Sequence, residues 1–262
     1  MRIMGRKADV DFCKMLVITI GIFVVMVCLN SSFAKSANLT SMCYQIPELG
    51  LYSMAMMMTM LSDGIDLSVV SIGNLSAILS AKVMSYATVN ELSGLGLLGF
   101  VLLGILVALA VGAFFGIING LVVAHIKITP MLATMATSSI IQGISIIVTQ
   151  GHTVNGAPSQ FTRFGSSTLL HIPYSMWILI IVIIVTAFLL RRTKFGFEVK
   201  MVGSNPKASY FTGMNINQIY VKTYLYSGIV SSVCGIIILM RTNAAKADYA
   251  STYVMQAILC SV

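Results

Sequence analysis

The stretch "LGLLGFVLLGILVALAVGAFFGIINGLVVA", residues 95–124, contains no charged side chain. A helix crosses the hydrocarbon core of a bilayer in about 20 residues, because each residue adds about 1.5 Å to its length. The stretch is therefore long enough and apolar enough to cross a membrane. It predicts a membrane-spanning helix.

The composition of the whole chain points the same way. Of the 262 residues, 57% are hydrophobic and 9% are charged, whereas a soluble domain carries about 25% charged residues. Such a chain predicts an all-α, polytopic transmembrane bundle, organised as a single transmembrane domain over residues 1–262. The predicted spans are 15–34, 45–61, 67–87, 95–124, 129–149, 174–190, 218–240 and an eighth from Tyr253 that still continues at Val262.

The net charge of +8 is distributed as expected when basic loops stay in the cytoplasm. With a cytoplasmic N-terminus, the segments 62–66, 125–128 and 191–217 also lie inside, and 150–174 becomes an external loop. Eleven of the 16 basic residues then lie inside or at inner ends: Arg2, Arg6, Lys7, Lys14, Lys127, Arg191, Arg192, Lys194, Lys200, Lys207 and Lys222. No basic stripe with interleaved aromatic residues suggests nucleic acid. The first apolar run can also be interpreted as a signal peptide.

The chain lacks the motifs of catalysis. Its five cysteines form no C-x-x-C pair or metal-ligand spacing, and its three histidines are far apart. No G-x-S-x-G, H-E-x-x-H or P-loop motif is present. We expect no catalytic residue, no metal and no cofactor in this chain.

Small residues recur at every fourth position of the 95–124 span: Gly104, Ala108, Gly112, Gly116 and Gly120. This spacing leaves a smooth groove along one side of a helix, where another backbone can approach closely. The pattern predicts tight helix packing, and it is also compatible with a helix interface that moves.

The 129–149 span carries a polar stripe on one helix face: Thr134, Ser138, Gln142, Ser145 and Thr149. Ser and Thr often bond their own i−4 carbonyl or a neighbouring helix. An amide such as Gln142 is costly to bury without partners. The stripe therefore predicts either helix packing or the lining of a path for a neutral, polyhydroxylated solute.

A helix break is predicted at "SDGIDLSVVSIGN", residues 62–74. Gly64 interrupts the helix, and Asp66 is placed to cap the next helix by accepting from its free N–H groups. The alternative is that Asp63 and Asp66 form a functional joint, since acids at a helix break in a membrane are costly.

The stretch "VGSNPKASYFTGMNI", residues 202–216, contains its own helix-start and helix-stop signals. Asn205 suits the N-cap, Pro206 the first helical position, and Gly213 the residue past the end. A helix over 206–212 would be about 10 Å long and too short to be stable alone. We expect it to rest on the membrane domain or to dock a soluble partner in the cytoplasm.

Three blocks resemble the permease subunits of bacterial ATP-binding-cassette importers for ribose, xylose, galactose and related monosaccharides. They are "GIDLSVVSIGNLSA" (64–77), "GIINGLVVAHIKITPMLATMATSSIIQGISIIVTQG" (116–151) and "TKFGFEVKMVGSNPKASYFTGMNI" (193–216). The chain departs from the family pattern at Val70, Ala136, Ser209 and Met214.

The resemblance implies that 191–217 holds the cytoplasmic coupling segment, which fits a cleft on a separate ATP-hydrolysing subunit. The coupling residues expected on this basis are Gly203, Asn205, Pro206, Lys207, Ala208, Tyr210 and Gly213. The implied partners are that ATPase subunit, a periplasmic or lipid-anchored sugar-binding protein, and a second permease subunit, most simply a homodimer. The implied location is the bacterial cytoplasmic (inner) membrane. Family members continue past "YVMQAILCSV" with about two more helices, so we expect this chain to stop inside a span.

Two alternative functions would each need particular residues. An ion-coupled secondary transporter of a small polar solute would need intramembrane acids, for which Asp63, Asp66 and Glu48 are the candidates. A membrane-embedded enzyme would need a nucleophile or metal constellation, and none is visible.

Overall fold

The computed structural model describes residues 2–30, 33–90, 94–169 and 172–261. The chain divides into two compact units, Met1–Tyr44 and Gln45–Val262. The first contains α1 (Arg2–Leu29) and the start of α2 (Ser36–Met60). Within it, the rings of Phe23 and Phe33 meet edge to face with centroids 5.5 Å apart.

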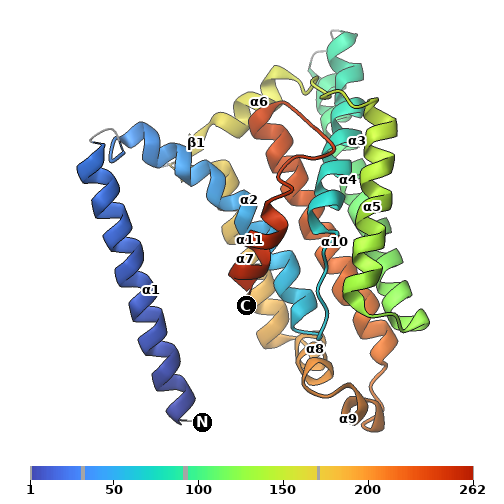
Figure 1. Cartoon of the computed structure of the whole chain (residues 1–262). Helices are drawn as coiled ribbons and strands as arrows, with labels where there is room; N and C mark the ends of the chain where they lie inside the picture. The colour runs from blue at the N-terminus through green and yellow to red at the C-terminus, as the bar shows by residue number, and fades with distance from the viewer. Residues whose placement is uncertain (1, 31–32, 91–93, 170–171, 262) are drawn as a thin grey trace. The chain divides into compact units, whose positions relative to one another are not determined.

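The second unit holds the end of α2 and every later element (Figure 1). Its remaining helices are α3 (Val69–Val89), α4 (Leu95–Leu121), the π-helical turn η1 (Val122–Ile126), α5 (Pro130–Thr149), α6 (Ser159–Ser166), α7 (Tyr174–Arg192), α8 (Lys194–Ser204), α9 (Pro206–Phe211), α10 (Ile216–Thr242) and α11 (Tyr253–Ser261). Two short strands, β1 (Thr168–Leu169) and β2 (Ile172–Pro173), pair antiparallel.

The prediction of an all-α polytopic membrane protein is confirmed. A helix lies at each of the eight predicted positions. Among the described residues, five helical segments are long and apolar enough to span a bilayer by length and composition: Val69–Val89, Leu95–Ile126, Pro130–Thr149, Tyr174–Arg192 and Ile216–Thr242. A shorter apolar helical stretch covers Cys13–Leu29.

The core of the second unit forms around α3 and α10. Figure 1 shows α10 through the middle of this unit, with α4 and α5 along one side and the end of α2, α7 and α11 along the other. One core cluster joins Leu51, Met56, Val69, Leu179 and Ile237, which come from α2, α3, α7 and α10. This buried cluster therefore fixes the positions of α3, α10 and the end of α2, the helices beside the candidate site.

The predicted external loop 150–174 contains no span. It carries α6 and the β1–β2 pair instead. Its first part is tied to the segment that follows α10, because Val154 and Ala245 exchange two backbone hydrogen bonds, each 2.9 Å long.

Candidate functional site

The short helix α9 has the ends that its sequence predicts. The Asn205 side chain accepts a hydrogen bond from the backbone N–H of Ala208 at 3.0 Å, and Pro206 opens the helix. At the other end Gly213 adopts φ +81°. The N–H groups of Gly213 and Met214 donate to the carbonyls of Tyr210 and Ser209 at 3.0 and 3.3 Å, which is the Schellman pattern. The helix ends at Phe211, one residue before the predicted end.

A second helix, which was not predicted from the sequence, precedes α9. α8 starts where the Thr193 hydroxyl accepts from the N–H of Gly196 at 3.3 Å. Thr at a helix N-cap followed by Pro206 beyond the end was the available signal. We call residues 194–213, with α8 and α9, the coupling segment, after the role that the resemblance predicts for this part of the chain.

The coupling segment is attached to the C-terminal end of α2 and the N-terminal end of α10. Val199 and Val202 of α8 are buried in a cluster with Ile219 of α10. Gly203 lies directly on the backbone at the end of α2, since a Cβ added there would overlap the carbonyl oxygen of Leu61. No other residue type fits this contact without a backbone shift.

The outer side of α9 is open. Of its six residues only Ser209 is buried. The Tyr210 and Phe211 side chains are 69% and 87% exposed, and Lys207 and Ala208 are exposed as well. The helix therefore offers two aromatic rings and a cation to whatever lies beside it.

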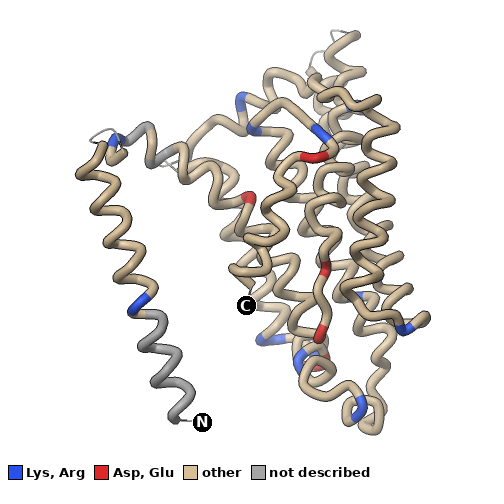
Figure 2. Tube along the Cα trace, viewed as in Figure 1, with Lys and Arg blue, Asp and Glu red and all other residues tan. Residues whose placement is uncertain are grey.

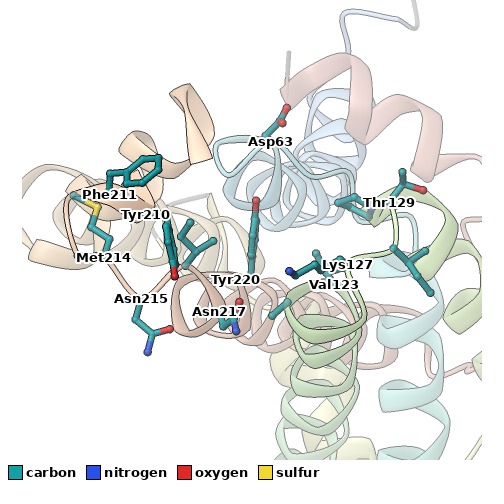
Figure 3. A pocket seen from close by; sticks show the side chains of 15 residues that line it. Asp63, Val123, Lys127, Thr129, Tyr210, Phe211, Met214, Asn215, Asn217 and Tyr220 are labelled. Atoms are coloured by element: carbon teal, nitrogen blue, oxygen red, sulfur yellow. The ribbon is translucent and has the colours of Figure 1, made fainter. Parts of the chain in front are cut away.

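A pocket of about 970 Å³ adjoins α9 (Figure 3). Figure 3 shows the rings of Tyr210 and Tyr220 and the side chain of Lys127 around it. Asp63 and Lys127, two of its lining residues, have φ of +63° and +58°. Left-handed backbone at non-glycine residues is costly and gathers at functional sites.

The break between α2 and α3 centres on Asp66, whose side chain is fully buried. Its Oδ1 accepts from the Ser68 N–H at 3.0 Å and from the Ser68 hydroxyl at 2.6 Å. Its Oδ2 accepts from the Ser227 hydroxyl of α10 at 2.8 Å. Burial raises the pKa of the Asp66 carboxyl, and the hydrogen bonds from Ser68 and Ser227 act against that rise.

The predicted capping role of Asp66 needs a correction. Ser68 occupies the N-cap position of α3. Asp66 accepts from the N–H of Ser68, one residue before the helix, and not from the first helical turn. The acid is two residues too early for a direct cap, so it forms a tight turn leading into the helix.

Side chains from two further helices hold this break. The Asn119 amide of α4 donates to the Ser68 hydroxyl at 2.8 Å. The Thr134 hydroxyl of α5 accepts from the Leu67 N–H at 3.1 Å. Its one proton is shared between the Pro130 carbonyl of its own helix at 2.9 Å and the Ile65 carbonyl at 3.1 Å. We call residues 61–68 the α2–α3 joint.

The five small residues of α4 lie against two neighbouring helices. A Cβ at Gly104 would come within 2.8 Å of Met84 on α3, and one at Gly116 within 2.6 Å of the Tyr224 carbonyl oxygen on α10. A Cβ at Gly112 would overlap the carbonyl oxygen of Gly228. Ala108 and Gly120 are buried in the same row.

The polar stripe of α5 divides into two kinds of position. Thr134 and Ser138 bond the joint and Ser71 of α3, the latter pair at 2.7 Å. Ser145 and Thr149 are buried and donate to their own i−4 carbonyls, both at 2.8 Å. Gln142 alone of the five is exposed. The helix-packing interpretation fits four of them, and the path hypothesis now depends on Gln142.

One polar cluster was not predicted. Glu48 of α2 is buried and pairs with Arg241 of α10, Oε1 to Nε at 2.6 Å. Arg241 also donates to the Tyr249 hydroxyl at 3.0 Å. The Asn74 amide of α3 donates to the carbonyls of Ala247 and Tyr249 at 3.1 and 2.8 Å. This cluster holds the segment between α10 and α11, and no local sequence pattern could have revealed it.

Among the described residues, five helices long and apolar enough to span a bilayer, together with a capped surface helix, define an all-α polytopic membrane protein. A family model described as "Branched-chain amino acid transport system / permease component" matches residues 38–262, and the chain belongs to this family. The resemblance to monosaccharide importer permeases is confirmed by the curated relatives.

The ribose import permease protein of Bacillus subtilis is 29% identical over 248 residues, 93% of this chain and 74% of the relative. The ribose import permease protein of Escherichia coli K12 is 27% identical over 95% of this chain and 75% of its own length. The L-arabinose transporter permease protein of Azospirillum brasilense is 26% identical over 80% of this chain and 59% of its own length. No solved structure matches the chain.

Proposed function

We propose that this chain is the permease subunit of an ATP-binding-cassette importer that passes a monosaccharide into the cytoplasm. The observation that supports the proposal most directly is α9, a firmly capped helix with four of its six residues exposed, in a chain of this permease family. The names of the relatives support ribose or a similar sugar as the cargo. ATP hydrolysis then belongs to a separate subunit, and this chain has no catalytic role.

The partners follow from this assignment. The ATPase subunit docks on the coupling segment, where Gly203, Asn205, Pro206, Lys207, Ala208, Tyr210 and Gly213 shape or present α9. A periplasmic or lipid-anchored binding protein delivers the sugar at the opposite face. Two permease subunits, as a homodimer, enclose the path in the bacterial cytoplasmic membrane, with the N-terminus of each in the cytoplasm.

Docking at α9 has a test with a matched control. Gly213 and Gly151 both have a left-handed backbone, φ +81° and +76°, and both have open space where a Cβ would point. Gly213→Val and Gly151→Val therefore impose similar strain, one on the coupling segment and one on the predicted external loop. We expect only Gly213→Val to reduce co-purification of the ATPase subunit. Equal retention of the ATPase by both variants would rule out docking at α9.

An ion-coupled transporter is disfavoured by the positions of the three candidate acids. Glu48 is ion-paired with Arg241, and Asp66 accepts three hydrogen bonds through its two oxygens. Asp63 is exposed beside the pocket. An acid that binds and releases a coupling ion must be able to change partners, and the two buried acids are already engaged.

Uptake measurements separate the two mechanisms. The permease is reconstituted in liposomes with its ATPase and binding protein, and radiolabelled ribose uptake is followed. We expect uptake that requires ATP inside the vesicles and persists when proton and sodium gradients are dissipated. Uptake driven by an ion gradient without ATP would overturn the proposed function.

A further inference from the structure

The coupling segment and the α2–α3 joint touch at one direct backbone contact and through an apolar cluster beside it. Gly203, at the end of α8, lies on the carbonyl of Leu61 with no side chain between them. Val202 and Leu61 pack in the same apolar cluster. Two backbones in direct contact cannot approach further, because close-packed interiors have low compressibility and transmit a displacement to their neighbours. A shift of α8 therefore acts directly on the first residues of the joint.

The joint itself is irregular backbone held from three sides. Ser227 of α10 and Asn119 of α4 reach it through Asp66 and Ser68. Thr134 of α5 bonds its backbone on both sides of Asp66. The eight residues of the joint therefore contact α4, α5 and α10, and they lead directly into α3. Whatever moves the joint changes the packing of all of them.

Two buried polar groups beside the joint, the Asn119 Oδ1 atom and the Tyr224 hydroxyl, have no hydrogen-bond partner among the described residues. The Tyr224 hydroxyl lies 2.6 Å from where a Cβ of Gly64 would stand. Buried polar groups are nearly always paired. An arrangement that paired these two groups would compete with the present one, and proteins are known to switch between discrete packings.

We infer that the α2–α3 joint receives the movement of the coupling segment and passes it to α3, α4, α5 and α10. In this scheme Gly203 and Asp66 are positioning residues for transport: Gly203 sets the contact, and Asp66 ties the joint to α10. The inference rests on the proposed function, because it assigns a receiver to the force that the ATPase subunit applies at α9.

The test uses the complete transporter in liposomes and a pair of matched serines. Ser227 and Ser231 are both fully buried on α10, one turn apart. The Ser227 hydroxyl donates to Asp66 at 2.8 Å, whereas the Ser231 hydroxyl donates to the carbonyl of Ser227 within its own helix at 2.8 Å. Ser227→Ala removes the hydrogen bond between α10 and Asp66 of the joint. Ser231→Ala removes a similar buried hydroxyl, whose hydrogen bond lies within α10 and does not reach the joint.

We expect both variants to assemble with the ATPase and to keep the basal ATPase rate. Ser227→Ala should lower the number of sugars moved per ATP roughly tenfold, the scale of one lost hydrogen bond to a charged group, while Ser231→Ala stays near the wild-type ratio. Ser227→Thr, which keeps the hydroxyl, should restore the ratio. Equal ratios in both alanine variants, or no rescue by threonine, would overturn the inference.

A second measurement follows the joint directly. Asp63 of the joint and Lys127 beyond η1 are both exposed, so each can carry a spin label after substitution by cysteine. We expect the distance between the labels to change when the complete transporter binds ATP, and to change less with Ser227→Ala. An unchanged distance in a transporter that imports sugar overturns the inference alone. Loss of ATP-driven uptake in the wild type overturns the proposed function and the inference with it.

Discussion

The Tyr224 hydroxyl occupies the space beside Gly64 into which a Cβ would point. The Tyr224 side chain is fully buried and its hydroxyl has no partner among the described residues. A Cβ on Gly64 would lie 2.6 Å from that hydroxyl, and its next neighbour, Cβ of Pro130, would be at an ordinary 3.4 Å. The hydroxyl oxygen is therefore the atom that requires glycine at position 64.

A double-mutant cycle tests this contact. Gly64→Ala alone should destabilise the protein by about 1–3 kcal/mol, as overpacking does in cores. Tyr224→Phe alone should be neutral or stabilising, because it removes a buried hydroxyl that is unsatisfied. The double variant should recover most of the loss, measured as the apparent Tm in detergent. Simple addition of the two single effects would mean that the two groups do not meet.

Gln142 decides whether the polar stripe of α5 lines a path. Its side chain is exposed, whereas Ser145 next to it on the stripe is buried and bonds the Ile141 carbonyl at 2.8 Å. We expect Gln142→Leu to lower ribose uptake several-fold without changing assembly, and Ser145→Ala to leave uptake near wild type. Unchanged uptake in Gln142→Leu would leave the whole stripe to helix packing.

At the scale of elements, α4 and α10 are in direct backbone contact. Gly112 and Gly228 face each other so closely that a Cβ on either would overlap the carbonyl oxygen of the other. Gly116 and Gly120 continue the contact toward η1. Small residues allow this approach, and van der Waals contact stabilises helix pairs in a membrane.

Glycines of α4 provide both the test and its control. Gly112→Ala should separate α4 from α10 and lower the apparent Tm by several degrees. Gly99, in the same helix, has open space where a Cβ would point. Gly99→Ala should be neutral or stabilising by about 0.5–1 kcal/mol, since alanine restricts the unfolded chain. If both substitutions shift Tm equally, the loss is due to helix propensity and not to the contact.

Elements with a local signal could be predicted, and those that depend on distant partners could not. The apolar runs gave the positions of the spans, and the residues at 205, 206 and 213 gave both ends of α9. The role of Asp66 was predicted only in part, because its partner Ser227 is 161 residues away. Glu48 and Arg241 are separated by 193 residues. Such pairs form only when tertiary packing has brought their helices together.

At the scale of the whole molecule, the charge distribution predicts the orientation that the proposed function needs. Figure 2 shows many of the Lys and Arg residues of the second unit gathered at the end that carries α8 and α9. Lys194, Lys200 and Lys207 belong to the coupling segment itself. Basic segments stay on the cytoplasmic side during insertion, which is the side on which an ATPase subunit must dock.

Cysteine labelling in intact cells tests this orientation. After replacement of Cys13, Cys28, Cys43, Cys234 and Cys260 by serine or alanine, a single cysteine is introduced as Lys207→Cys on α9 or Ser159→Cys on α6, two exposed positions. A maleimide that can pass the outer membrane but not the cytoplasmic membrane should label Ser159→Cys in intact cells. It should label Lys207→Cys only after the cytoplasmic membrane is opened. The reverse pattern would place the coupling segment outside, where no cytoplasmic ATPase can reach it, and would remove the basis for docking at α9 and for transmission through the α2–α3 joint together.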